Sequence, residues 1–266
     1  MNGLGSVNFN YGNQYYYLPS NNNTFTHPGE SNYEPQNPEK TILTAGLLQA
    51  FALFLHKASQ WCGNKLMGGK EFTTAENLKK AAQNMVEKNK LNVTVDFIDH
   101  NNIKNYPPDL WESLVPVAKG ENAFYTDQFK LAVAPKSKPS LILHELGHAI
   151  NAHKGKFLKT LQKSRMYVSA VPTALLMLNS LFKRDDNRLN FVERNAGVIG
   201  FAAFLPTIAE EGLASIRGVK AARETLGKSI NLGPLKRNYF FAWLTYLIAG
   251  IGLGVAAKQS MIENKR

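Results

Sequence analysis

Apolar residues in this chain gather into four runs, which cover residues 41–55, 166–182, 195–209 and 239–257. A helix needs about 20 apolar residues to cross the hydrocarbon core of a bilayer. The last run is long enough for this, and the two before it are slightly short. Charged residues fill 183–188 between those two runs, so the pattern predicts a hydrophobic helical hairpin over 166–209. The run at 41–55 predicts an amphipathic or core helix, with a further membrane-spanning or interfacial helix as the alternative.

Shorter periodic segments lie between the first and second runs. Residues 74–88 carry apolar side chains at helical spacing, and Thr73 with Glu76 has the Ser/Thr-x-x-Glu form of a capping box. Residues 93–98 alternate as a strand does, and 122–126 and 130–134 predict two more short strands. We therefore expect an α+β fold that is mainly helical, with a short antiparallel sheet, the inserted hairpin and a C-terminal hydrophobic helix.

Composition divides the chain further. Residues 1–40 are rich in Asn, Tyr and Pro and poor in aliphatic residues, which predicts a disordered tail. We expect one catalytic domain over 41–237, and a C-terminal hydrophobic helix and tail over 238–266. The single cysteine, Cys62, excludes an internal disulfide and agrees with a reducing compartment.

The chain is basic, with 31 Lys and Arg against 20 Asp and Glu and a net charge of +11. These charges flank the apolar segments instead of lining a patch studded with aromatic residues, so we expect no nucleic-acid partner. Basic residues are more numerous at the two ends of the predicted hairpin than in its connecting loop. The positive-inside rule then predicts a multi-pass membrane protein whose catalytic side faces the cytoplasm.

The segment that carries chemistry is His144-Glu145-Leu146-Gly147-His148, within an apolar stretch that predicts a buried helix. Histidines at positions i and i+4 lie on one helical face, so both imidazoles can bind the same zinc ion. Glu145 would lie beside that ion, where its carboxylate could take a proton from a water molecule. The alternative is a buried helix whose histidines only form hydrogen bonds.

A catalytic zinc site takes three protein ligands and leaves a position open. The third ligand is sought in Glu210-Glu211-Gly212-Leu213-Ala214, where we favour Glu211 over Glu210. His153 is a rival, but it lies five residues after His148 and so faces elsewhere on a continuous helix. The acidic pair could instead be a cluster at a helix N-terminus, favoured by the helix dipole.

With these motifs and the hydrophobic hairpin between them, the chain resembles the integral-membrane gluzincins of the CAAX prenyl protease and HtpX heat-shock protease family. The strand segments before the motif helix, which include Asn122-Ala123-Phe124, add to the resemblance. It implies a zincin-like metallopeptidase module, with zinc bound by His144, His148 and Glu211 and with Glu145 as the general base. Those families usually carry an Asp where this chain has Ser215. In them the Asp steadies a ligand histidine.

The resemblance further implies that the strand at Ala123, Phe124 and Tyr125 lines the substrate cleft. Arg217 and Tyr125 are the available choices for a residue that stabilises the oxyanion. The predicted function is a zinc-dependent endopeptidase that acts on polypeptide substrates and contacts membrane lipids. Two alternatives stay open: a soluble zinc protease whose apolar helices pack internally, and a non-catalytic membrane protein with a structural zinc site.

Overall fold

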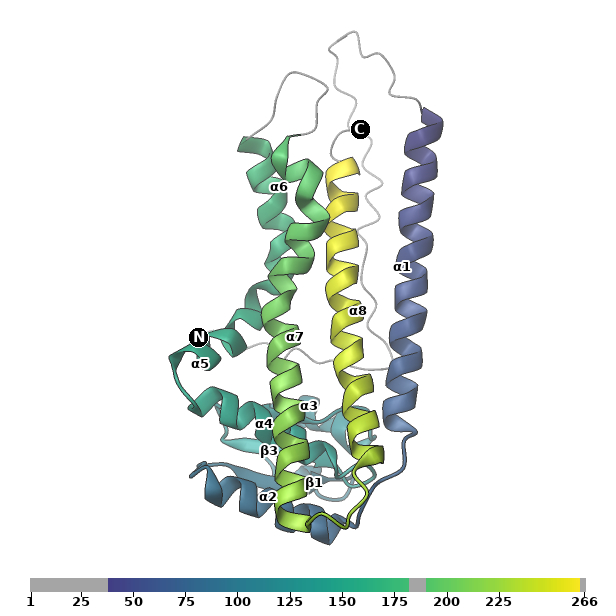
Figure 1. Ribbon diagram of the computed structural model, residues 1–266. Coiled ribbons are helices and arrows are strands. Elements are labelled where there is room, and N and C mark those ends of the chain that lie inside the picture. The colour runs from purple at the N-terminus through teal and green to yellow at the C-terminus, as the bar shows by residue number, and fades with distance from the viewer. Residues whose placement is uncertain (1–37, 182–189, 264–266) are drawn as a thin grey trace.

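The computed structural model describes residues 38–181 and 190–263 (Figure 1). The elements in chain order are α1 (Pro38–Met67), α2 (Ala75–Lys88), β1 (Thr94–Ile98), the 3₁₀ helix η1 (Ile103–Asn105), α3 (Pro108–Ala118), β2 (Phe124–Thr126), β3 (Leu131–Pro135), α4 (Leu141–His153), α5 (Lys156–Ser164), the 3₁₀ helix η2 (Arg165–Ala170), α6 (Val171–Leu181), α7 (Phe191–Leu226) and α8 (Gly233–Glu263). Helices α1, α6, α7 and α8 run alongside one another as an elongated stalk (Figure 1). The sheet and helices α2, α3 and α4 form a small module at one end of it.

The sheet of the module has the strand order β1-β3-β2. Strand β1 is parallel to β3, and β2 is antiparallel to β3, so the sheet is mixed and the predicted antiparallel sheet is wrong in this respect. The cause is α3, which the sequence reading did not predict. A parallel pair needs a crossover connection that usually contains a helix, and η1, α3 and β2 all lie between β1 and β3. The central strand β3 is buried along its whole length.

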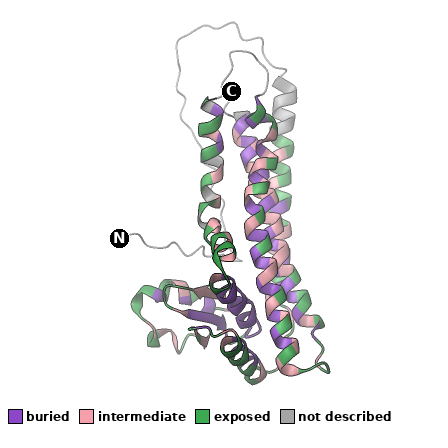
Figure 2. Cartoon of the chain, turned by 60° about the vertical axis from the view of Figure 1, so that its left-hand side comes forward, coloured by how far each residue is buried: buried purple, intermediate pink, exposed green. Residues whose placement is uncertain are grey.

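Helix α4 is the centre of the module, because every residue from Leu141 to Asn151 is buried. It packs against β3, β2, α2 and α7, and its apolar side chains join the largest core cluster. Buried residues concentrate in the module and on the inner faces of the stalk (Figure 2). A histidine motif on such a helix is therefore fixed from all sides.

Most of the predicted helices are present with different boundaries. The helix predicted at 74–88 is confirmed, although its N-cap is Thr74, whose side chain accepts a hydrogen bond from the backbone N–H of Asn77 at 3.3 Å. The run at 41–55 lies within the 30-residue helix α1, which begins inside the segment predicted as tail. The remainder of that tail and the charged loop at 183–188 lie outside the described residues.

The predicted hairpin corresponds to η2 and α6 followed by α7. The first run is interrupted, since its first residues are in η2 and only Val171–Leu181 form an α-helix. The second run belongs to a helix of 36 residues that continues through the Glu210-Glu211 pair. The acidic pair thus lies in the middle of a helix, and its assignment to a helix N-terminus is wrong.

Two helices of the described residues, α7 and α8, are long and apolar enough to cross a membrane. Their most apolar windows are only 39% and 33% buried, whereas the core helix of a soluble protein is mostly buried. Exposed large apolar side chains also lie along the neighbouring stalk helices, among them Leu47, Phe51, Leu53, Phe54, Met177 and Leu181. The stalk therefore presents an apolar surface to its surroundings.

Candidate metal centre

Helices α4 and α7 cross at Gly147 and Ala214, and this crossing assembles the site. A Cβ atom on Gly147 would lie 2.5 Å from the carbonyl oxygen of Ala214 and 2.7 Å from its Cα. Only glycine permits so close an approach of the two backbones. The small residues of the two sequence motifs therefore face each other, and they bring the motif histidines against the acidic pair.

Three side-chain atoms converge at the crossing. The Nε2 atom of His144 lies 3.1 Å from Nε2 of His148 and 3.1 Å from Oε2 of Glu211. The third distance, from Nε2 of His148 to Oε2 of Glu211, is 3.5 Å. Ligand atoms around a tetrahedral zinc, with bonds of about 2.0–2.1 Å, stand about 3.3 Å apart. The triangle therefore has the size that a zinc ion requires, and the donor set of two imidazoles and a carboxylate suits zinc.

The second nitrogen of each imidazole is held by a different partner. Nδ1 of His148 contacts Oε1 of Glu210 at 2.7 Å, and Nδ1 of His144 contacts Oγ of Ser215 at 3.1 Å. If both Nδ1 atoms carry the proton, both Nε2 lone pairs are free for a metal. The serine at position 215 thus orients a histidine, although it replaces the aspartate of the resembling families.

Glu210, the less favoured choice for the third ligand, contacts the other nitrogen of the His148 ring. Its carboxylate accepts a hydrogen bond from Nδ2 of Asn151 at 2.8 Å and contacts Nδ1 of His148 on the far side of the ring. It is fully buried. Glu210 is therefore in the right place to orient His148 and to raise its basicity as a ligand.

Arg165, at the start of η2, closes the site and was not predicted. Its guanidinium pairs with Oε2 of Glu210 at 3.1 Å and with Oε1 of Glu211 at 2.6 Å. It also lies over the ring of Tyr246, 5.8 Å from the ring centroid. By engaging Oε1 of Glu211 it leaves Oε2 directed at the histidines. The arginine thus fixes which carboxylate oxygen faces the metal position.

The site contains more carboxylates than cationic side chains. Burial raises the pKa of Glu145, against the opposing effect of the nearby histidines. Burial alone lowers the pKa of His148, but the carboxylates of Glu210 and Glu211 outweigh it and hold that pKa well above its ordinary value. Among the described residues, Arg165 is the cationic side chain paired with Glu210 and Glu211, and the buried carboxylate of Glu145 lies next to them, so the centre attracts a further cation. A proton on His148 or a divalent metal ion would supply the missing positive charge. Binding of the metal would displace the proton from His148.

The general base predicted from the sequence lies beside the same centre. Carboxylate and ring-nitrogen atoms of Glu145, His144 and His148 lie within 4.8 Å of one another, and all three residues are buried. His153 is separate from this group, because its Nδ1 contacts the carbonyl oxygen of Ala149 at 2.8 Å. The structure therefore brings His144, Glu145, His148 and Glu211 together and leaves His153 apart.

The residues predicted to line the substrate cleft lie at the edge of the sheet. Phe124 and Tyr125 belong to β2, which pairs with β3 and packs against α4, and Ala123 immediately precedes it. The outer backbone edge of β2 has no strand partner among the described residues. The hydroxyl of Tyr125 donates to Asp127 at 2.9 Å, so its proton is already engaged.

Arg217 lies on α7, two turns beyond Glu210. Among the described residues no hydrogen-bond partner reaches its buried Nη1 atom. It forms an ion pair with neither Glu210 nor Glu211, and both of these carboxylates pair with Arg165 instead. Arg217 keeps a free donor, and Arg165 is the arginine in direct contact with the site.

Comparison of the chain with protein-family models, with curated proteins and with solved structures finds no match. The resemblance to gluzincins rests on the motif residues and on the layout of the helices that carry them.

Proposed function

We propose that this chain is a membrane-embedded zinc endopeptidase with a zincin-like module of the gluzincin type. The observation that carries the proposal is the triangle formed by Nε2 of His144, Nε2 of His148 and Oε2 of Glu211, whose edges measure 3.1, 3.1 and 3.5 Å. The buried carboxylate of Glu145 next to this triangle supports a catalytic role, since a purely structural zinc site has no use for a base at that position.

The chemistry follows from the positions of these side chains. When bound, a zinc ion supplies a Lewis acid that lowers the pKa of a water molecule and polarises the scissile carbonyl. The Glu145 carboxylate accepts the proton of that water and later donates it to the leaving amine. Burial raises the pKa of Glu145, and a general base whose pKa lies closer to the working pH takes up and gives up a proton more readily.

Substrate binding is assigned to the free edge of β2. An extended polypeptide adding to this edge forms backbone hydrogen bonds, a mode that tolerates many sequences. The edge lies beside α4, which carries two of the three proposed ligands. Polypeptides that are unfolded or lie at a membrane fit this mode of recognition.

The membrane setting is supported by α7 and α8, whose apolar windows are only 39% and 33% buried. The soluble alternative requires these windows to be mostly buried by protein, and the described residues bury only a minority of their positions. Basic residues on α5 and in the second half of α7 favour a cytoplasmic position for the module.

The test is casein cleavage by the full chain purified in mild detergent, together with zinc measured per chain. Glu145→Gln should retain zinc and lose about 10²–10⁴-fold in rate, which is the usual contribution of a general base. Glu112→Gln, at an exposed position on α3, is the matched control and should behave as wild type. Zinc retention with equal cleavage by wild type and Glu145→Gln would reject the assigned mechanism, and cleavage by neither would favour the structural zinc site.

The membrane part of the proposal has its own test. Cells that express the chain are broken, and their membranes are washed with alkaline carbonate and then with detergent. We expect the chain to remain with the membranes through the carbonate wash and to need detergent for extraction. Recovery in the detergent-free supernatant as a monodisperse protein would favour the soluble alternative.

A further inference from the structure

A cavity of 420 Å³ opens where the stalk meets the module. It is lined by Asn64, Lys65, Gly68, Gly69, Arg237 and Phe241. These residues come from the end of α1, the segment just after it and the first turns of α8. No residue of the metal centre lines the cavity, and no part of the proposed hydrolysis uses it.

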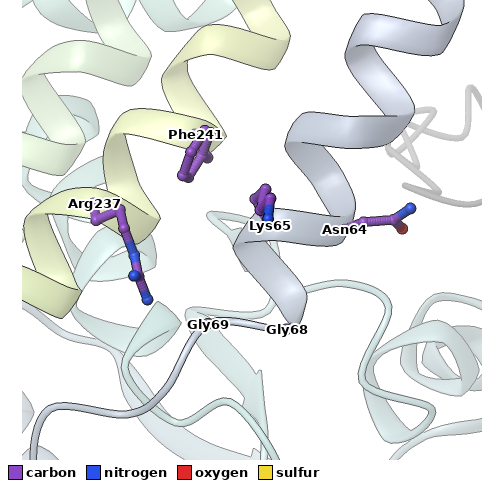
Figure 3. Close-up of a pocket in the computed structure, with 6 residues that line it drawn as sticks. All are labelled: Asn64, Lys65, Gly68, Gly69, Arg237 and Phe241. Atoms are coloured by element: carbon purple, nitrogen blue, oxygen red, sulfur yellow. The ribbon is translucent and has the colours of Figure 1, made fainter.

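Two cations from different helices face this cavity. Figure 3 shows Lys65 projecting from α1 into the space between the helices and Arg237 reaching from α8 toward Gly69. Both side chains belong to exposed residues. Over residues 38–181 and 190–263, no carboxylate forms an ion pair with either of them. The cavity therefore offers uncompensated positive charge to a ligand.

A third cation lies behind the cavity and is compensated. Lys138 is 2% exposed, donates a hydrogen bond to the carbonyl oxygen of Gly69, and lies 3.6 Å from Glu71. Burial lowers the pKa of Lys138, Glu71 opposes this, and the positive charge of Arg237 adds to the lowering. Arg237 is thus close enough to Lys138 for the two charges to repel. An anion in the cavity would relieve that repulsion.

The backbone of the cavity does not supply anion-binding donors. The N–H of Gly68 donates to the carbonyl of Asn64 at 2.9 Å, and the N–H of Gly69 donates to that of Leu66 at 3.3 Å. Attraction of an anion therefore depends on Lys65 and Arg237. Removing both side chains is a selective way to abolish it.

Aromatic residues lie next to the cavity, on the same parts of α1 and α8. Trp61 packs edge-to-face on Phe241 at 5.4 Å, and Lys65 lies 5.7 Å from the centroid of the Trp61 ring. Phe240 contacts Phe241 and Trp243 in turn. Aromatic and basic side chains at the end of an apolar helix are typical of the membrane–water interface. The cavity consequently lies at the depth of lipid headgroups if α8 spans the bilayer.

We propose that this cavity binds a phosphate group, presented by an anionic phospholipid headgroup or by a soluble phosphate compound. Basic pockets between helices at a membrane surface are suited to such headgroups. The inference is independent of peptide hydrolysis, and only the lipid source rests on the membrane placement proposed above. Lys65 and Arg237 hold the phosphate, and the apolar flank of Phe241 accommodates the adjoining glycerol and chain.

The test reconstitutes the full chain in phosphatidylcholine bilayers with and without phosphatidylglycerol. The protein is re-extracted in a zwitterionic detergent, and the retained lipids are counted by native mass spectrometry. Wild type is compared with Lys65→Gln/Arg237→Gln. The control is Lys70→Gln/Lys236→Gln, which removes the same charge from exposed neighbouring positions that do not line the cavity. In a separate arm, inorganic phosphate is titrated into the detergent-solubilised protein. The signal is the intrinsic tryptophan fluorescence, to which Trp61 next to the cavity contributes.

Wild type and the control should retain phosphatidylglycerol over phosphatidylcholine. The cavity variant should bind it roughly 100-fold more weakly, because it loses two charged contacts with the phosphate and each contributes about a factor of ten. Lys65→Arg/Arg237→Lys should keep most of the binding. Binding of inorganic phosphate without lipid retention, abolished by the same variant, would assign the soluble source. Equal lipid retention by wild type and the cavity variant, or no binding of either probe by wild type, would overturn the proposal. Equal unfolding temperatures of all variants in detergent verify that they are folded.

Discussion

The crossing of α4 and α7 allows one perturbation to be worked out in detail, the substitution Gly147→Ala. The added Cβ would lie 2.5 Å from the carbonyl oxygen of Ala214, about 0.9 Å inside the lower limit of ordinary contact. Both atoms belong to helix backbones in a buried core, so no flexible side chain can yield. The two helices must separate by about 1 Å, a strain that typically costs about 1–3 kcal/mol of stability.

That separation acts directly on the metal centre, because His144 and His148 are on α4 and Glu211 is on α7. Their ligand atoms, now 3.1 and 3.5 Å apart, would stand about 4 Å or more apart. Metal–ligand bonds tolerate deviations of only about 0.2 Å. We therefore expect Gly147→Ala to weaken zinc binding at least about 100-fold, more than the loss of a residue that only orients a ligand.

The assay is competition with a chromophoric zinc chelator, alongside thermal unfolding in detergent. Gly212→Ala is the matched control, since it adds the same methyl group next to Glu211 but meets only the Trp243 ring, at 3.4 and 3.5 Å. It should bind zinc as wild type does and unfold at the same or a slightly higher temperature. Wild-type zinc affinity in Gly147→Ala would refute the assignment of this crossing as the assembly point of the site.

Three further predictions concern the same centre. Glu210→Gln removes the carboxylate that holds Nδ1 of His148 and should weaken zinc binding by about 10–100-fold in the chelator assay, whereas Glu224→Gln, on an outer face of the same helix, should have no effect. Stripping the metal should lower the unfolding temperature by roughly 5–10 °C relative to protein with zinc at 100 times its Kd, and readdition of zinc should restore it; an unchanged temperature would mean that no metal binds the folded chain. Because burial raises the pKa of Glu145, its carboxylate becomes protonated and inactive as a base at a higher pH than usual. The acid limb of the kcat/KM profile should therefore lie above the ordinary glutamate pKa of about 4.3, and a limb at or below that value would contradict the role of Glu145.

The sequence was informative about those parts of the site that follow from helical periodicity. His144 and His148 must share a face of any helix that contains them, and the small residues Gly147 and Ala214 agree with a close crossing. The preference for Glu211 over Glu210 as a ligand stays a prediction; the structure directs the Glu211 carboxylate toward Nε2 of His144 and the Glu210 carboxylate toward Nδ1 of His148.

Features that depend on tertiary packing could not be predicted. Arg165 is 45 and 46 positions from its carboxylate partners, and nothing in its local sequence marks it among the basic residues of α5 and η2. The mixed sheet depends on a crossover through α3, a helix that begins at Pro108 and has Pro116 inside it, and prolines are more typical of turns than of helices. Helix α7 continues through the acidic pair, so a hydrophobic run and a charged segment belong to the same helix. In the sequence, these two patterns indicate separate elements.

Zinc content of the purified full chain tests the central claim most directly. The protein is isolated in mild detergent without added metal, and its metals are measured by mass spectrometry beside His148→Ala, which removes one ligand atom. The account predicts about one zinc per chain in wild type and a large loss in the variant. A wild-type chain that binds no zinc, even after incubation with the metal, would contradict the account.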